Sequence, residues 1–175
     1  MKRRKLDMGT PSHKIGASIY GTALDRAKYR GYPKVNRQKV FSLDIDVRFR
    51  DLDALGHVNH AVFFTYFEVG RTILFRNVFG DRKFRFIMAH ACCDYLKPAT
   101  LNDQLRLWMR VGKIGTKSFE LQYELIDRHS DENRFAKGET IQVCYDYEEN
   151  RSIPVPEDMR KRLTEYQRGI EIVER

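Results

Sequence analysis

Two acids and two histidines lie close together within residues 51–60, between an alternating segment and an apolar one. Asp53 follows a predicted strand and precedes the start of a predicted helix by a few residues. The unpaired N–H groups and the dipole of a helix start attract negative charge, so they can keep a carboxylate ionised or bind a developing oxyanion. The segment therefore combines a general base or nucleophile with a site for an oxyanion.

The other polar residues of this segment have open interpretations. Asn59 is expected to cap the helix, and its side chain could also orient the acid or hold a water molecule. His57 is expected to bond the backbone within the turn. Asp51 is expected to be solvated, or ion-paired with Arg50 or Arg71.

A metal interpretation of the same residues is weaker. His57 and His60, with Asp51 and Asp53 nearby, could supply zinc ligands. Their spacing is short and generic, so we do not expect a metal site there.

The flanking periodicities predict the elements that position these residues. Residues 41–50 alternate apolar and polar side chains, with Phe49 on the apolar face, which predicts a strand with one buried face. Residues 59–79 are apolar around most of the helical circumference, which predicts a helix that is buried on most sides and ends at Gly80.

Further strands and a terminal helix follow. The strands are predicted at residues 86–97, 104–112, 118–127 and 135–147. Gly112 and Gly115 are expected to flank a hairpin turn, and Pro156 to begin the last helix. The order predicts an α+β domain with an antiparallel sheet around one buried helix.

The pattern Asp-x-Asp-x-x-Gly-His-Val-Asn-His at residues 51–60, followed by Phe-Glu-x-x-Arg at residues 67–71, resembles a known family. It is similar to the hot dog-fold acyl-CoA thioesterases, in the branch named for 4-hydroxybenzoyl-CoA thioesterase. The resemblance covers about residues 41–160 and includes the segments 94–98 and 152–156. It implies a hot dog fold, in which a sheet wraps around one long helix.

The resemblance also implies an activity and roles for residues. Water would cleave an acyl-CoA thioester into coenzyme A and a free acid, with Asp53 as base or nucleophile. Backbone N–H groups of His60 and Ala61 would polarise the carbonyl, and the His60 and Asn59 side chains would orient the reacting groups. His57 is a candidate substrate-binding residue.

Two departures from related proteins concern positions near this site. His60 stands where the branch more often has Asn, and it matches an active-site His of the Tol-Pal-associated thioesterases. Phe49 stands near a position where those relatives have Tyr, so a hydroxyl role is absent there.

Other candidates lie farther along the chain. A second branch of hot dog thioesterases uses an acid on the central helix, so Glu68 is the second-choice acid, although an ion pair with Arg71 is the simpler expectation. Related enzymes place basic residues on a hairpin against the phosphates of coenzyme A. Lys117 matches that position, with Ser118 as a weaker candidate.

The resemblance implies a dimer or a dimer of dimers, since an open sheet edge would be paired by a second copy. Three alternatives remain: hydrolysis of thioesters on acyl carrier protein, a hot dog hydratase, and a non-catalytic module that binds acyl-CoA or nucleic acid. The hydratase is disfavoured because its Asp and His are five residues apart, whereas Asp53 is four residues from His57 and seven from His60.

Charge is concentrated at the start of the 175-residue chain. Residues 1–40 hold eleven Lys and Arg and two Asp and Glu, a net charge of +9, whereas the other 135 residues hold 21 basic and 22 acidic side chains. We therefore expect a basic extension at residues 1–38 before a nearly neutral domain at 39–175. A neutral domain disfavours nucleic-acid binding.

The three cysteines, in strand-like segments, are expected to be reduced, buried thiols without metal-ligand spacing: Cys92, Cys93 and Cys144. No apolar run has the length of a membrane span, and no secretory signal is recognised. We expect a cytoplasmic protein, with organellar targeting left open.

Overall fold

The computed structural model describes residues 41–80 and 85–168. The basic extension and the expected short helix within residues 15–30 lie outside these residues. The described elements, in chain order, are β1 (Phe41–Asp46), the short 3-10 helix η2 (Phe49–Asp51), α1 (His60–Phe79), β2 (Phe86–Tyr95), β3 (Gln104–Ile114), β4 (Ser118–Asp127), β5 (Ser130–Asp146), β6 (Arg151–Ser152) and α2 (Glu157–Gln167).

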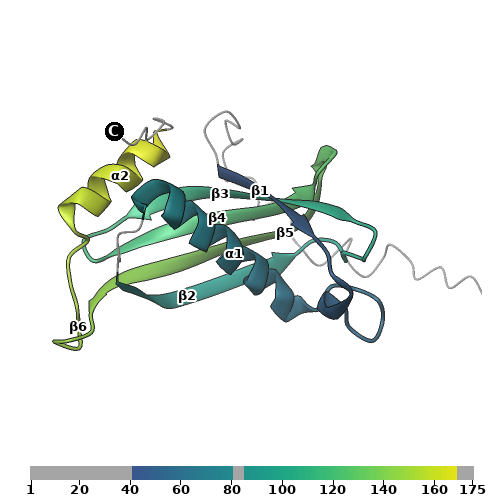
Figure 1. Cartoon of the computed structure of the whole chain (residues 1–175), viewed down its shortest axis with the longest axis horizontal. Coiled ribbons are helices and arrows are strands. Elements are labelled where there is room, and N and C mark those ends of the chain that lie inside the picture. Colours follow the sequence, from purple (N-terminus) through teal and green to yellow (C-terminus); the bar gives the residue numbers. More distant parts are fainter. Residues whose placement is uncertain (1–40, 81–84, 169–175) are drawn as a thin grey trace, which may run out of the picture. The chain divides into compact units, whose positions relative to one another are not determined.

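The strands form one antiparallel sheet in the order β1-β3-β4-β5-β2, with the short strand β6 added to β5. Helix α1 lies across one face of this sheet, and α2 packs at the far end of α1 (Figure 1). The expected architecture, an antiparallel sheet with one long helix, is confirmed. Strands β1 and β2 are the two edges of the sheet.

The alternation in β3 and β4 correctly predicts the sheet face that meets α1. Every second residue of these two strands is buried in one cluster with the helix, namely Leu105, Leu107, Met109, Val111, Phe119, Leu121, Tyr123 and Leu125. Burial of these side chains is the main contribution of the sheet to the stability of the domain, since apolar surface removed from water contributes about 25 cal/mol per Å².

Strand β1 is shorter than predicted. It ends at Asp46, and η2 then turns the chain, so the side chain of Phe49 is 82% exposed rather than buried. Gly112 lies within β3, and the hairpin turn falls at residues 115–117, because β3 continues to Ile114. Pro156 is the residue before α2, at its N-cap.

Strand β5 buries a different face from the one its apolar residues indicate. Thr140, Gln142 and Cys144 are buried, whereas Ile141 and Val143 are only half-buried. Polar side chains can lie inside when they hydrogen-bond one another, and here the Tyr123 hydroxyl is 2.7 Å from Thr140 Oγ1. The Gln142 side-chain amide donates to the same oxygen.

Helix α1 is less enclosed than its composition predicts. Phe63, Tyr66, Phe67 and Leu74 face the sheet and are buried, but a second face, which includes Thr65, Glu68 and Val69, is exposed in the single chain. The sheet described here therefore covers one side of the helix.

No helix within residues 41–80 and 85–168 is long and apolar enough to span a membrane.

Helix α1 approaches the sheet closely at Gly138 in β5. The ring of Phe67 stacks on Tyr123 with centroids 4.5 Å apart, directly over this position. A Cβ atom at Gly138 would lie 2.5 Å from the Phe67 ring and 2.8 Å from the Cys92 carbonyl oxygen. The helix can lie this close to β5 only because the residue has no side chain.

We expect Gly138→Ala to lower the free energy of unfolding by about 1–3 kcal/mol, the usual cost of overpacking a core. Urea unfolding followed by circular dichroism would measure the change. Gly115→Ala is the matched control, since a Cβ there meets only Ser118 atoms at 3.4 Å. Equal stability of the two variants would contradict the proposed close approach.

Candidate active site

Asp53 lies in a tight turn between η2 and α1, and its side chain is exposed. Its Oδ1 accepts hydrogen bonds from the backbone N–H groups of Leu55 (2.8 Å) and His57 (3.1 Å). The turn is closed by two backbone bonds, from the Asp53 N–H to the His57 oxygen and from the Gly56 N–H to the Asp53 oxygen. Gly56 has φ +79°, a conformation that glycine adopts readily.

These hydrogen bonds keep the carboxylate charged. The N–H groups of His57 and then Leu55 hold the pKa of Asp53 below its ordinary value of 3.8, against a small opposing effect of burial. Asp53 is therefore ionised at neutral pH, the state that a general base or a nucleophile requires. His57 contributes through its backbone, as expected for a turn residue.

The start of α1 supplies one unoccupied backbone donor. Asn59 is the N-cap, as predicted, and its Oδ1 accepts from the Ala61 N–H at 2.9 Å. The Val62 N–H bonds the Asn59 carbonyl oxygen. Of the two expected oxyanion donors, the N–H of Ala61 is thus engaged by the cap, whereas that of His60 has no partner among residues 41–80 and 85–168. The His60 side chain is exposed beside it.

A buried carboxylate, whose burial was not expected from the sequence, holds this loop. Asp51 is 3% exposed, and it pairs with Arg48 rather than with Arg50 or Arg71. Arg48 donates to it from its backbone N–H (2.9 Å), Nε (3.0 Å) and Nη2 (2.9 Å), and the Tyr66 hydroxyl of α1 donates at 3.0 Å. The expectation of a solvated Asp51 is wrong because the 3-10 turn points the side chain inward, toward Tyr66.

Asp51 also links the loop to the helix through its backbone. Its carbonyl oxygen accepts the N–H of Asn59 at 2.8 Å. The neighbouring Val58 N–H donates to the Ala99 oxygen at 2.7 Å. Burial alone would raise the pKa of Asp51, but the hydrogen bonds from Arg48 and Tyr66 outweigh it and lower the pKa below 3.8. The spacing Arg48-x-x-Asp51 could have indicated this contact, because residues three apart can form a local ion pair.

Glu68 pairs with Arg71 across one helical turn at 3.8 Å, as expected. Its side chain is 70% exposed, although the helix was expected to be buried on most sides. It lies on the face of α1 that the sheet does not cover, about two turns from His60.

Lys117 and Ser118 lie at the opposite end of the sheet from Asp53. Ser118 lies opposite Val143 on β5, and Val143 lies opposite Ile87 at the start of β2. The other end of β2 is at the helix start, because the Tyr95 hydroxyl donates to the His60 oxygen at 2.9 Å. Eight strand residues span roughly 26 Å. One chain therefore does not bring the Lys117 side chain to Asp53.

The Lys117 ammonium group is held locally at this end of the sheet. It donates to the Ser152 backbone oxygen (3.3 Å) and hydroxyl (3.2 Å).

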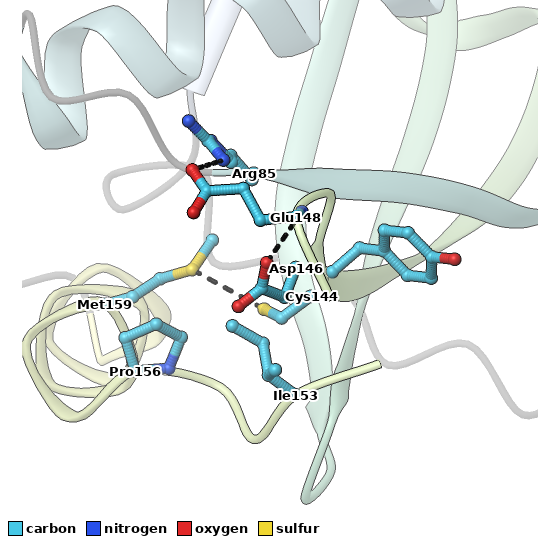
Figure 2. Close-up of a pocket in the computed structure, with 8 residues that line it drawn as sticks. Arg85, Cys144, Asp146, Glu148, Ile153, Pro156 and Met159 are labelled. Atoms are coloured by element: carbon cyan, nitrogen blue, oxygen red, sulfur yellow. Dashed lines mark hydrogen bonds and ion pairs between the residues drawn. The ribbon is translucent and has the colours of Figure 1, made fainter. Parts of the chain in front are cut away.

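A cavity of about 240 Å³ also lies at this end (Figure 2), lined by Arg85, Cys144, Tyr145, Asp146, Glu148, Ile153, Pro156 and Met159. Arg85 and Glu148 face each other across its rim at 3.3 Å. None of the predicted site residues lines this cavity.

The cysteines are all free thiols, but only Cys144 is buried. Cys93 is half-buried, and burial raises the pKa of its thiol to about 12. Cys92 is exposed, contrary to expectation, because it lies on the edge strand β2 with its side chain on the face away from α1.

Comparison with known sequences and structures places this geometry in a family. Residues 47–163 match the family described as the thioesterase-like superfamily. A thioesterase from Thermus thermophilus, solved in complex with coenzyme A and Zn, is 33% identical, with a TM-score of 0.66, over 74% of this chain and 94% of that one.

Two further relatives are known by sequence. A 1,4-dihydroxy-2-naphthoyl-CoA hydrolase from Nostoc punctiforme is 29% identical over 77% of this chain and 94% of its own length. The Bacillus subtilis protein YsmA is 32% identical over 82 residues, 45% of this chain, and the match spans 56% of that protein.

We expect Asp51→Asn to lower the free energy of unfolding at pH 7 by about 1–3 kcal/mol, because charged hydrogen bonds from Arg48 and Tyr66 are lost or weakened. The folded-state pKa of Asp51 is depressed, so its contribution is fully present above pH 3.8 and is lost as the pH falls through the lower folded value. Chemical unfolding at several pH values measures this: the gap between wild type and variant should shrink below about pH 4. A gap that stays constant with pH would contradict the ionic role.

Proposed function

Because the chain belongs to the thioesterase-like superfamily, and so to the thioester hydrolases, we propose that it hydrolyses acyl-CoA thioesters with Asp53 as the base or nucleophile. The products are free coenzyme A and a carboxylic acid. The reaction as proposed uses no metal and no organic cofactor.

A single observation supports this assignment most directly. An exposed, ionised carboxylate is fixed in a turn that runs into the start of a long helix, where the His60 N–H has no partner within the described part of the chain. Asp53 can accept a proton from water or attack the carbonyl carbon itself. The His60 N–H, reinforced by the positive end of the α1 dipole, is suited to the oxyanion that forms next.

The bond changes follow from these roles. Water, activated by Asp53, adds to the thioester carbonyl, and the resulting oxyanion accepts the His60 N–H. The C–S bond then breaks, and the leaving sulfur of coenzyme A takes the proton. In the nucleophilic route, Asp53 forms an anhydride with the acyl group, which water cleaves in a second step.

Asn59 and the His60 side chain complete the proposed site. Asn59 holds the Ala61 N–H through its cap, so a turn of its side chain would free that N–H for the carbonyl oxygen. The exposed His60 imidazole lies beside the helix start, where it can orient water or protonate the leaving sulfur. His57 helps to hold Asp53 through its backbone.

The coenzyme A moiety would be held by a second copy of the chain. Strand β2 is an open edge, and Ile87 and Met88 on it are 37% and 45% exposed. Antiparallel pairing of β2 with β2 would place the Phe86 end of one sheet beside the Tyr95 end of the other. Lys117 and Ser118 of one copy would thereby approach Asp53 of the other, and Lys117 could bind phosphate.

The acyl group is proposed to be aromatic or otherwise apolar. Phe49 and Leu55 are 82% and 81% exposed on the loop that carries Asp53, which offers an apolar surface next to the reacting carbonyl. The naphthoyl-CoA hydrolase of Nostoc punctiforme acts on an aromatic acyl group by its name, which favours including that class among test substrates. Acyl carrier protein thioesters are the alternative, and the same assay distinguishes them.

We expect Asp53→Asn to reduce kcat by about 10²–10⁴-fold while leaving the fold intact, since the amide can neither take the proton nor attack. Release of free thiol from short, long and aromatic acyl-CoAs, and from acyl carrier protein thioesters, measures the rate. Unchanged turnover in this variant would move the chemistry to Glu68. No turnover by a folded wild type on any thioester would overturn the proposed function.

Asp127→Asn is the matched control for this experiment. Asp127 is a half-buried acid in a similar turn, whose Oδ1 accepts the His129 N–H at 2.8 Å and whose pKa is likewise lowered by that bond. It ends strand β4 and is followed by a hairpin rather than by a helix start, so its loss should leave kcat unchanged.

The pH profile adds an independent check. Protonation of Asp53 itself should reduce the rate only below pH 3.8, because its pKa is depressed. A loss of rate near about pH 6.5 would instead indicate a histidine.

For Lys117→Ala we expect KM for an acyl-CoA to rise about tenfold or more with a small change in kcat, because a phosphate contact anchors a part of the substrate remote from the carbonyl. Steady-state kinetics on an acyl-CoA and on the same acyl group carried by a short thiol without phosphates measure the effect. The variant should match wild type on the short thioester. Equal effects on both substrates would contradict a phosphate contact.

A further inference from the structure

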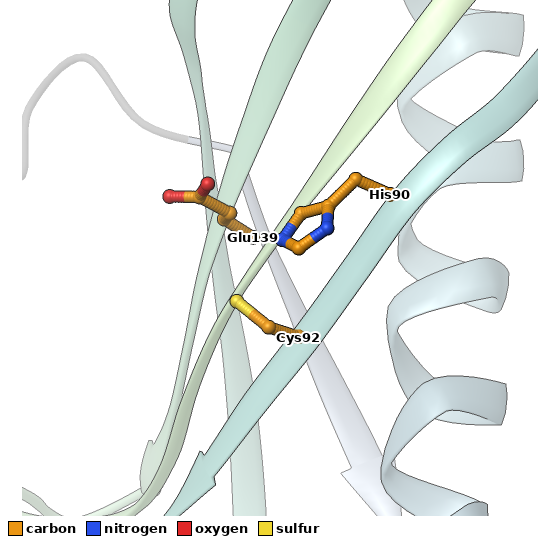
Figure 3. Close-up of side chains that lie close together, drawn as sticks. All are labelled: His90, Cys92 and Glu139. Atoms are coloured by element: carbon orange, nitrogen blue, oxygen red, sulfur yellow. The ribbon is translucent and has the colours of Figure 1, made fainter.

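A cluster of three different donor side chains lies outside the proposed thioesterase site. His90 and Cys92 on β2 and Glu139 on β5 each offer one ligand atom, and these atoms lie within 4.8 Å of one another. Figure 3 shows the imidazole, the thiol and the carboxylate converging beside the two strands. No other group of three or more such side chains comes together in residues 41–80 and 85–168.

The backbone register brings these side chains to one face of the sheet. Cys92 is the direct partner of Glu139, and His90 is two residues from Cys92, so all three share a face. That face is opposite to α1, since neighbouring Gly138 is the residue beneath Phe67 of the helix.

A bulge in β2 lies just before His90, and the three donors occupy a regular stretch of the pairing with β5. The register shifts between Met88, opposite Gln142, and His90, opposite Ile141. In a regular strand Met88 would share the face of His90, but the extra residue between them places Met88 on the face of Gln142 instead.

The surroundings of the cluster carry negative charge. The carboxylates of Glu139, Asp94 and Glu120 lie near the Cys92 thiol. Glu120 accepts a hydrogen bond from Gln122 and points toward Gly112, so it adds charge without converging on the thiol. A cation is favoured at this position.

We propose that His90, Cys92 and Glu139 bind one divalent transition-metal ion, zinc by their donor types, with water at the remaining position. Nitrogen, thiolate sulfur and carboxylate oxygen are the donors that zinc takes in proteins, commonly in a four-coordinate tetrahedron. Metal–ligand bonds of about 2.0–2.3 Å require the ligand atoms to approach by roughly 1 Å. His90 and Cys92 are exposed, so their side chains can rotate to do so.

Binding replaces the Cys92 thiol proton, which is released to solvent, and the thiolate and the carboxylate together balance the charge of the ion. The ion would join the edge strand β2 to β5 as a clip. It has no part in the proposed hydrolysis, so the two assignments stand or fall separately.

Zinc titration of the chelator-stripped full-length protein by calorimetry, with cobalt absorption as a second readout, tests the site. We expect one ion per chain and visible cobalt bands that report a thiolate ligand. Cys92→Ser and Glu139→Gln should each weaken zinc binding by at least about 10–100-fold, the range already seen when outer-shell partners of metal ligands are removed.

Two variants serve as controls. Cys93→Ala removes the neighbouring thiol of β2, and His60→Asn removes the histidine of the alternative zinc site near Asp53; both should bind zinc as wild type does. Unfolding midpoints of the metal-free variants check that each one folds, and zinc should raise the midpoint of wild type but not of Cys92→Ser.

Thiol reactivity separates this site from other bound zinc. Zinc should slow the reaction of one exposed thiol with a disulfide reagent in wild type, and it should fail to do so in Glu139→Gln, which retains Cys92. Absence of zinc binding to folded wild type, unaltered affinity in Cys92→Ser, or loss of binding in a control variant would each overturn the proposal.

Discussion

A buried carboxylate between the end of the first strand and the long helix determines the geometry of the candidate site. Asp51 receives three hydrogen bonds from Arg48 and one from Tyr66 of α1. Because its carbonyl oxygen also accepts the Asn59 N–H, one residue ties together the preceding turn, the helix interior and the helix start. A buried charge lacking such partners would be costly, so the loop is held in the one arrangement that satisfies Asp51.

In that arrangement the proposed reacting groups are exposed, and the proposed phosphate-binding group is distant from them. Asp53 and the His60 N–H are at one end of the sheet, and Lys117 is at the other, bonded to Ser152. The single chain also exposes one face of α1, including Thr65, Glu68 and Val69, and the edge of β2. The proposed second copy, paired at β2, would cover apolar surface and join the two ends of different sheets.

The sequence predicts a strand or helix correctly where its apolar pattern fits only one arrangement. Alternation in β3 and β4 indicates their buried faces, and the apolar segment after Asn59 indicates α1 and its cap. The exposed Phe49 could not be predicted, because the strand pattern continues in the sequence after β1 has turned into η2. In β5, hydrogen bonds among polar residues allow the less apolar face to be buried, so hydrophobicity alone indicates the wrong one.

The sequence motif predicted where the candidate site residues lie, but it predicted less well which residues contact one another. Asp53, Asn59 and His57 lie in the turn and cap that their residue types indicate. The partner of Asp51 depends on a turn of three residues, and the exposure of Cys92 depends on the place of β2 at the sheet edge. The proximity of His90 to Glu139 depends on pairing between strands far apart in sequence, which residue spacing does not encode.

Local environment alone does not distinguish Asp53 from other acids of this chain. Asp127 and Asp146 also accept backbone N–H groups and also have lowered pKa values. What differs is the element that follows: a hairpin strand follows Asp127, whereas the 20-residue helix α1 begins at His60, shortly after Asp53. The reactivity proposed for this carboxylate therefore comes from its position beside a helix start that retains a donor, and a depressed pKa is a consequence of the turn that holds it there.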